Sequence, residues 1–241
     1  MTRIVIIAIL VLFAFGDLTE AAGVSQYRAK VRACLSTLIE HGQDSYGEKA
    51  TPILVSILDV NTLECPREPK TYDEAWRVIR RHRRNPAGAD LATDMQTLSA
   101  MKRLGGRYER FAGDYINYYM THFLSAKQRL VCWGWHEYYD VFADKCVFDQ
   151  HELHAGLDTI DWPLLWEVNP NALKRQAEQT WQWHVIDKKT GEINRHGDGQ
   201  RGCDFTMSAG SFIELFSFMF KATDDAQWLE RAQLIANYYW G

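Results

Sequence analysis

The sequence predicts an all-α protein, an incomplete α/α toroid built as a barrel of helical hairpins. Apolar side chains recur at helical spacing along most of the chain, and long alternating strand patterns are not apparent. A weak repeat also runs through the chain, in which an apolar helix, a short polar turn and a second helix follow one another. Because one hairpin cannot bury its apolar face alone, repeated hairpins predict stacking into a solenoid or a closed toroid.

The first residues are typical of a signal peptide. Met1 to Arg3 give a positive start, residues 4–15 are apolar, and residues 19–22 offer small side chains for cleavage. The apolar stretch is shorter than the roughly twenty residues that span a bilayer. We therefore expect residues 1–22 to be a signal peptide, residues 23–241 to be a partial toroid domain, and the protein to be secreted or periplasmic, with no membrane contact after signal cleavage.

Apolar periodicity predicts a series of helices in the mature chain. Several begin at good capping residues, such as Asp90 and the Asn-Pro-Asn segment at 169–171. The predicted helices cover residues 26–40, 51–58, 72–84, 90–104, 108–123, 162–167, 171–185, 208–221 and 225–239.

Three of these helices carry the repeat, each with an alanine at the same position. Ala112, Ala177 and Ala232 have a large apolar residue four positions earlier and an aromatic residue six positions later. At about 60 residues per hairpin, the chain holds fewer units than a toroid of six or seven hairpins needs. We therefore expect the domain to be incomplete, with a truncated C-terminus. A chance alignment of three amphipathic helices is the alternative interpretation.

Net charge, aromatic content and cysteine number limit the classes of function that we expect. A net charge of −4 disfavours a basic nucleic-acid binder, so we expect no nucleic-acid partner. Nine Trp, eleven Tyr and eleven Phe are typical of a concave site lined by aromatic rings. Five cysteines permit two disulfides, and Cys132 with Cys146 is the pair to test first, with burial as small apolar residues as the alternative.

The densest group of chemically active side chains lies between Cys132 and Gly202. It comprises Cys-Trp-Gly-Trp-His-Glu-Tyr-Tyr-Asp at 132–140, His-Glu-Leu-His at 151–154 and Asn-Arg-His-Gly-Asp at 194–198. Imidazole and carboxylate groups together suit zinc, manganese, iron or nickel better than calcium. A His-Glu-x-x-His motif is absent, so a metalloprotease has little support.

The cluster resembles the metal-dependent pectate lyases of polysaccharide lyase family 2. The likeness covers roughly residues 132–200, and its most specific element is His-Glu-Leu at 151–153 followed by Arg-His-Gly at 195–197. Further matching positions are Leu164, Leu165, Val168, Asn169, Pro170, Trp181, His184 and Asp187.

The resemblance implies an α/α barrel, an acidic polysaccharide substrate such as pectate, and a divalent metal of the Mn, Ni, Co or Zn type. It implies His136, Glu152 and His196 as metal ligands and Arg195 as the catalytic residue. Around them, His154, Trp135, Tyr138 and Tyr139 are candidates for substrate binding.

The chemistry accounts for these residue types. β-Elimination removes the C5 proton of a uronate, and the charge that develops on the neighbouring carboxylate needs a cation. A free guanidinium is almost always protonated, so Arg195 can act as the base only if its pKa is strongly lowered. Two interpretations stay open: Arg195 is the base, or Arg195 clamps the carboxylate while His154, Tyr138 or Tyr139 accepts the proton.

Two other functions compete with a lyase. An α/α-barrel glycoside hydrolase would use paired carboxylates, such as Glu137 or Asp140 with Asp158 or Asp161. A truncated, non-catalytic carbohydrate-binding protein would keep the aromatic groove and release no product. In each case we expect a monomer.

Overall fold

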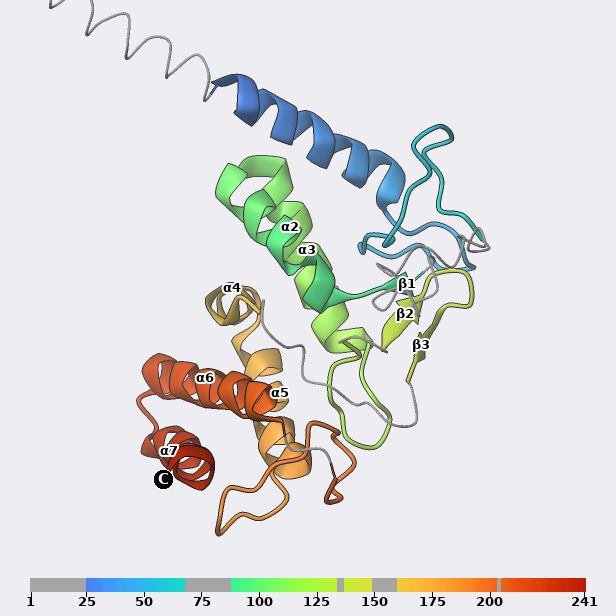
Figure 1. Cartoon of the computed structure of the whole chain (residues 1–241). Coiled ribbons are helices and arrows are strands. Elements are labelled where there is room, and N and C mark those ends of the chain that lie inside the picture. The colour runs from blue at the N-terminus through green and yellow to red at the C-terminus, as the bar shows by residue number, and fades with distance from the viewer. Residues whose placement is uncertain (1–24, 68–87, 134–136, 149–159, 203–204) are drawn as a thin grey trace, which may run out of the picture. The chain divides into compact units, whose positions relative to one another are not determined.

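The computed structural model describes residues 25–67, 88–133, 137–148, 160–202 and 205–241 (Figure 1). The chain divides into two compact units, residues 1–40 and residues 41–241. A helix over residues 25–42 occupies the described part of the first unit and confirms the helix expected at 26–40. The predicted signal peptide at 1–22 lies outside the described residues.

Within the described ranges, no helix has both the length and the apolar character needed to cross a membrane.

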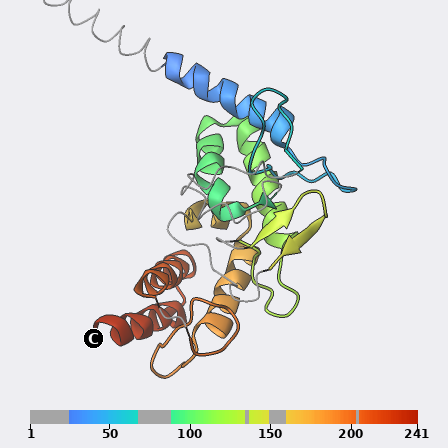
Figure 2. The ribbon, with the colours of Figure 1, turned by 45° about the vertical axis from the view of Figure 1, so that its right-hand side comes forward.

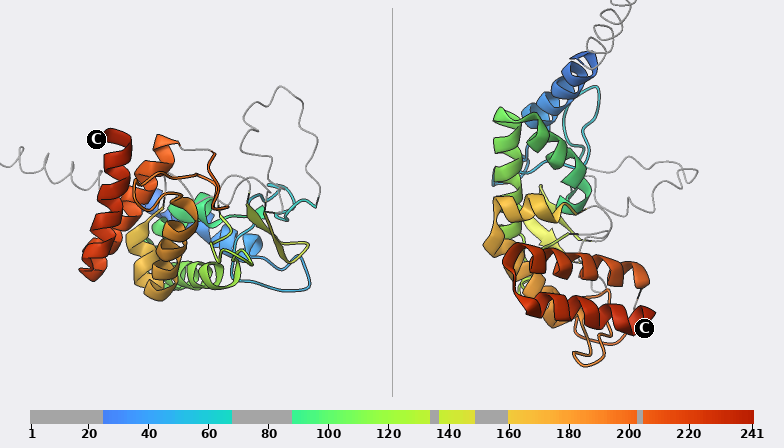
Figure 3. Two further views of the ribbon diagram at one scale, coloured as in Figure 1. Left: turned by 90° about the horizontal axis from the view of Figure 1, so that it is seen from below. Right: turned by 90° about the vertical axis from the view of Figure 1, so that its left-hand side faces the viewer.

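The second unit consists mainly of three helical hairpins, which confirms the all-α, toroid-like fold class. In each hairpin the two helices pack against each other, and in the third they run side by side (Figure 3). The pairs are α2 (Leu91–Leu104) with α3 (Gly106–His122), α4 (Trp162–Val168) with α5 (Pro170–His184), and α6 (Thr206–Thr223) with α7 (Ala226–Trp240).

Short turns with special backbone geometry separate the helices of each hairpin. Gly105 has a φ of 72°, a conformation that glycine adopts without steric cost. Asn169 ends α4, and its side chain accepts a hydrogen bond from the Ala172 N–H at the start of α5. Asp224 is left-handed, with a φ of 56°, and Asp225 then caps α7. These are the polar turns that the sequence repeat contains.

Polar bonds join one hairpin to the next. Lys102 of α2 contacts Glu109 of α3 and Glu167 of α4, each at 2.5 Å. Ser99 of α2 donates to Asp161, whose carboxylate also caps α4. The first and second hairpins are therefore held in register by side chains from three helices.

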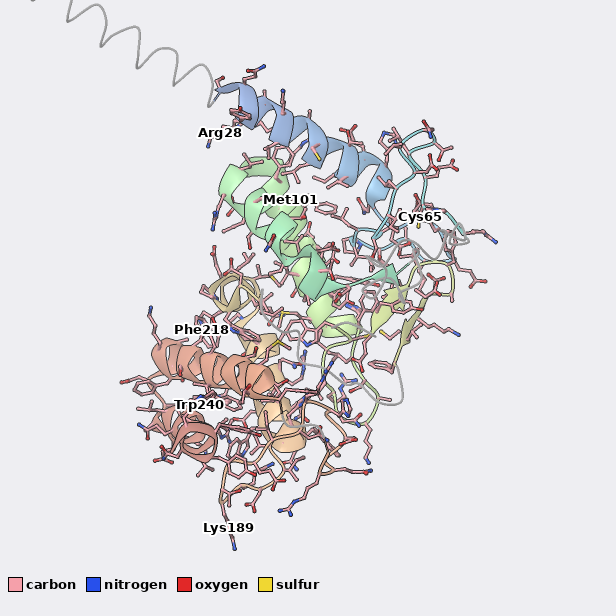
Figure 4. All side chains as sticks on the ribbon, viewed as in Figure 1. Arg28, Cys65, Met101, Lys189, Phe218 and Trp240 are labelled. Atoms are coloured by element: carbon pink, nitrogen blue, oxygen red, sulfur yellow. The ribbon has the colours of Figure 1, made fainter. Side chains whose placement is uncertain are left out.

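The alanines that mark the sequence repeat all lie in the core. Ala112, Ala177 and Ala232 are all buried, which lets neighbouring helices approach closely at equivalent points of the three hairpins. Figure 4 shows Phe218 on the side of α6 that faces α4, where its ring lies edge to face with Trp166 at 6.3 Å. Helix α6 also packs against α5, so the second and third hairpins share a core.

The helix predicted for residues 51–58 is wrong. The segment is irregular there, because the Asp44 N–H donates to the Ile53 carbonyl and the Asp44 carbonyl accepts the Thr51 N–H. The Thr51 hydroxyl also donates to the buried Asp44 carboxylate at 2.7 Å. Such local bonds offer the backbone an alternative to a helix. The helix predicted for residues 72–84 lies outside the described part of the chain.

A small antiparallel sheet completes the described part (Figure 2). Its strands are too short for alternation to reveal them in the sequence. They are β1 (Gly88–Ala89), β2 (Tyr138–Asp140) and β3 (Lys145–Val147), with Ala89 opposite Tyr139 and Tyr139 opposite Cys146.

The sheet is joined to α3 by an aromatic side chain. Tyr119 is fully buried, and its hydroxyl lies 3.0 Å from the Ala89 carbonyl and 2.6 Å from the Cys132 carbonyl. Phe123, one turn later, stacks on Tyr139 of β2 at 3.9 Å. These contacts fix β2, which carries two of the predicted site residues.

The two cysteines singled out in the sequence lie together. The buried Cys132 thiol donates weakly to the carbonyls of Tyr138 and Val147, which pair across β2 and β3. Burial and a hydrogen bond with Cys146 raise the pKa of Cys132. Both residues are thiols in the structure, so the disulfide stays a prediction.

Candidate functional site

The predicted site divides between described and undescribed residues. Arg195, His196, Tyr138 and Tyr139 are described. The predictions for His136, Glu152, His154 and Trp135 lie outside the described residues.

Arg195 and His196 lie on the loop that follows α5. The loop doubles back on itself, because Val185 bridges Ile193 and the Ile186 N–H donates to the Glu192 carbonyl at 2.7 Å. At its tip, Gly191 adopts a φ of 87°, and a Cβ there would lie 2.4 Å from the Leu234 carbonyl oxygen of α7. Only glycine permits this close contact between the loop and α7.

His184, at the end of α5, anchors the base of this loop. It is fully buried, and its Nδ1–H donates to the Asn194 carbonyl oxygen at 3.0 Å. The Asn194 N–H in turn donates to the His184 carbonyl at 2.7 Å. Because the backbone N–H and carbonyl of Asn194 both bond His184 of α5, the residues after Asn194 continue from a fixed point beside the helix.

The side chain of Asn194 also organises the segment that contains Arg195 and His196. Its side-chain oxygen accepts the His196 N–H at 2.9 Å, and its amide donates to the Gln200 carbonyl at 2.7 Å and to Asp198 at 3.2 Å. With 1% exposure, the side chain is enclosed by the turn that it organises. The sequence placed Asn194 in the cluster but assigned it no role. Its position directly before Arg-His-Gly could have indicated this role, because Asn side chains often bond the backbone of their own turn.

Arg195 is partly exposed, and its side chain rests on an aromatic face. The guanidinium carbon lies 5.1 Å from the centre of the Phe205 ring. Phe205 itself is 48% exposed at the start of α6. His196 is also partly exposed, so the loop presents a guanidinium and an imidazole from adjacent residues.

The two tyrosines of β2 have different environments. Tyr139 is 3% exposed, stacks on Phe123 and donates its hydroxyl to Asp144 at 3.1 Å. Burial and the Asp144 carboxylate both raise the pKa of Tyr139. Tyr138 is partly exposed on the other face of the strand. The substrate contacts expected for both tyrosines stay predictions.

Two carboxylates considered for the hydrolase alternative, Asp140 and Asp161, accept hydrogen bonds from backbone N–H groups. Asp140 accepts the N–H groups of Phe142 and Ala143, and Asp161 caps α4. Glu137 is fully buried beside the sheet. Asp158 lies outside the described residues. Asp140 and Asp161 therefore act in a turn and a cap, which is a structural use of these groups.

Metal-binding residues can be assessed only in part. The described ranges contain no group of three His, Cys, Asp or Glu side chains that could hold an ion. Of the predicted ligands, only His196 belongs to those ranges. Two imidazoles and one carboxylate form a donor set that suits a divalent transition metal.

Comparison with known proteins identifies the family of the segment that contains the candidate site. A profile of the family described as periplasmic pectate lyase matches residues 88–209, about half of the chain. The chain belongs to the periplasmic pectate lyase family. No curated protein matches it.

The match to the periplasmic pectate lyase family begins at β1 and ends in the first turn of α6. It therefore includes the sheet, α2 to α5 and every predicted site residue. The family confirms the resemblance inferred from the sequence, an acidic polysaccharide substrate, and a secreted or periplasmic location.

Proposed function

We propose that this protein cleaves an acidic polysaccharide such as pectate by metal-assisted β-elimination. The observation that carries the proposal is the Arg195–His196 pair, presented on a turn organised by Asn194 inside the segment that matches the family. Adjacent cationic and metal-ligating side chains suit a reaction that develops negative charge on a substrate carboxylate.

The chain's own residues have distinct tasks in this proposal. Arg195 holds the uronate carboxylate or removes the C5 proton, and its stacking on Phe205 orients the guanidinium. Asn194 keeps Arg195 and His196 in a fixed relation to α5. Tyr138, with its partly exposed ring, lies on the strand next to the undescribed residues 134–136 and is the better placed tyrosine for a sugar contact.

His136, Glu152 and His196 are the residues that would hold a divalent ion of the Mn, Ni, Co or Zn type. Such an ion supplies positive charge that neutralises the substrate carboxylate and acidifies the adjacent C5 proton. We further propose that the protein acts as a monomer and has no nucleic-acid partner.

Replacing Arg195 tests the proposal directly. Arg195→Ala should lower kcat/KM on polygalacturonate by about 10²–10³-fold, because the main cationic contact to the developing charge is lost. The measurement is the ultraviolet absorbance of the unsaturated product, with and without added metal. Lys189→Ala removes one positive charge from the exposed tip of the same loop and is the matched control.

The competing functions predict different results. A glycoside hydrolase would release reducing ends without unsaturated product and would survive chelation. A carbohydrate-binding protein would bind galacturonan and release nothing. Either result would overturn the lyase proposal.

A further inference from the structure

Helix α5 carries a row of side chains that the proposed reaction does not use. Arg175, Gln179 and Trp183 are spaced four residues apart and therefore line one edge of the helix over about 12 Å. The loop after α3 packs against α5, since its Val131 N–H donates to Gln176 at 2.9 Å (Figure 2).

The same loop adds two cations to this edge. The Lys127 ammonium nitrogen lies 5.2 Å from the centre of the Trp183 ring. Arg129 is exposed on the tight turn formed by residues 125–130, where the Arg129 N–H donates to the Ser125 carbonyl. We refer to Lys127, Arg129, Arg175 and Trp183 together as the α5 strip.

The cations of the α5 strip have no acidic partners within the described ranges. Arg175 is partly buried and donates to the Met120 carbonyl, while its Nε–H is buried without a hydrogen-bond acceptor. Burial and the nearby charge of Arg129 lower the pKa of Arg175. Like charges held together without a counter-charge create a positive potential that attracts an anion.

The α5 strip ends at the loop that carries Arg195. A Cβ on Gly199 would lie 3.4 Å from the Trp183 ring, so the loop backbone runs close to that ring. Asn194 ties Gln200 and Asp198, on either side of Gly199, to the turn that holds Arg195 and His196. The loop that carries Arg195 and His196 therefore reaches Trp183, at one end of the α5 strip.

We propose that the α5 strip is a binding site for uronate units of the substrate that lie beyond the unit at Arg195. The cations would pair with successive carboxylates, and the ring of Trp183 would hold the Lys127 ammonium in position for this contact. This inference rests on the proposed function for its choice of polymer. Arginine pairs well with carboxylates, and a regular polyanion matches a row of cations better than a single small acid does.

Length dependence of binding tests the inference on the full mature chain. The double variant Lys127→Gln with Arg129→Gln should weaken binding of a galacturonate hexasaccharide about tenfold or more, measured by titration calorimetry. Binding of the disaccharide should stay the same, because a short ligand does not reach the α5 strip. Trp183→Ala should show the same length-dependent loss.

The control variant combines Lys189→Gln with Lys221→Gln, which removes two exposed charges from other places. It should leave hexasaccharide binding within twofold of the wild-type value. Thermal melting of each variant checks that the fold is intact, and both replaced cations of the α5 strip are exposed, so the fold should persist.

Three outcomes would overturn the inference: equal losses for the short and long oligomers, no loss in the double variant, or an equal loss for polyglutamate or single-stranded DNA. The last would indicate a general polyanion surface.

The proposed function is judged separately. If Arg195→Ala leaves product formation unchanged while the double variant still loses hexasaccharide binding, the proposed role of Arg195 in the lyase reaction is wrong and the α5 strip is still supported as a binding site.

Discussion

At the scale of single residues, Asn194 shows how one buried amide can define the turn that contains the candidate residues Arg195 and His196. Its side chain makes three hydrogen bonds to the segment 196–200, and its backbone makes two to His184. A buried amide with all its groups bonded specifies one conformation, and its removal leaves polar groups of the turn without partners.

We predict that Asn194→Ala destabilises the protein by about 1–3 kcal/mol and lowers kcat/KM further than unfolding explains. Asn194→Asp should recover part of the activity, since a carboxylate oxygen can still accept the His196 N–H. Chemical denaturation and steady-state kinetics measure the two effects. Activity of the alanine variant equal to wild type in fully folded samples would contradict a positioning role.

Asp44 provides a pH prediction. Burial raises the pKa of Asp44 above its ordinary value, so the folded protein holds the proton more tightly than the unfolded chain does. This contribution to stability is complete below the ordinary pKa of an aspartate and is lost as the pH rises through the raised value.

Asp44→Asn should therefore gain free energy of unfolding relative to wild type as the pH rises from about 4 to 7. Asparagine has one acceptor oxygen, so it keeps one of the two bonds that Asp44 accepts from Thr51 and Tyr46. Urea denaturation across this pH range is the measurement. A constant difference between the two proteins would show that Asp44 has no raised pKa.

At the scale of elements, the helices were largely predictable and the connections were not. Asp90 and Asn169 cap α2 and α5 as the sequence suggests, because such residues satisfy free N–H groups at helix starts. Residues 51–58 carry helical periodicity, yet Thr51 and Ile53 bond Asp44 and no helix forms there. The strands of two or three residues are fixed by distant partners such as Tyr119, which no local pattern reveals.

The candidate site was predictable to a similar degree. The Arg-His-Gly motif indicated a candidate loop that lies inside the segment matching the family, and its role in the site stays a prediction. The organising bonds of Asn194 and the placement of Trp183 beside Lys127 depend on how α5 packs against two loops. Contacts of this kind join segments far apart in the chain, so they produce no periodic pattern of residues that a sequence analysis could detect.

The loop between α5 and α6 yields a prediction about glycine. Gly191→Ala should cost about 1–3 kcal/mol, because the new Cβ meets the Leu234 carbonyl and the φ of 87° strains any other residue. Gly210→Ala is the control: it lies inside α6 with open space around it, and alanine should stabilise that helix by about 0.5–1 kcal/mol. Thermal unfolding of both variants checks the opposite signs.

At the scale of the whole molecule, location determines the state of the cysteines. A secreted or periplasmic protein meets oxidising conditions, and Cys132 and Cys146 lie within hydrogen-bonding reach of each other. Cys146 is partly exposed, so an oxidised dithiol protein or oxidised glutathione can reach it. Exchange with that oxidant would join the two sulfurs while the oxidant is reduced to thiols.

We predict that the exported protein contains a Cys132–Cys146 disulfide that adds about 3 kcal/mol to its stability, as expected for a closed loop of this length. Mass spectrometry after alkylation, with and without prior reduction, identifies the bond. Cys132→Ser should lose the redox dependence of melting, whereas Cys34→Ser should keep it. Alkylation of both thiols in the exported protein before reduction would contradict the prediction.

The contact between Gly191 and Leu234 also affects the order in which the protein can assemble. Synthesis proceeds from the N-terminus, so the residues around Arg195 emerge well before α7 does. Until α7 arrives, the tip of the Arg195 loop has no surface on which to settle. The turn that holds Arg195 and His196 should therefore reach its final arrangement only after α7 has packed against the loop.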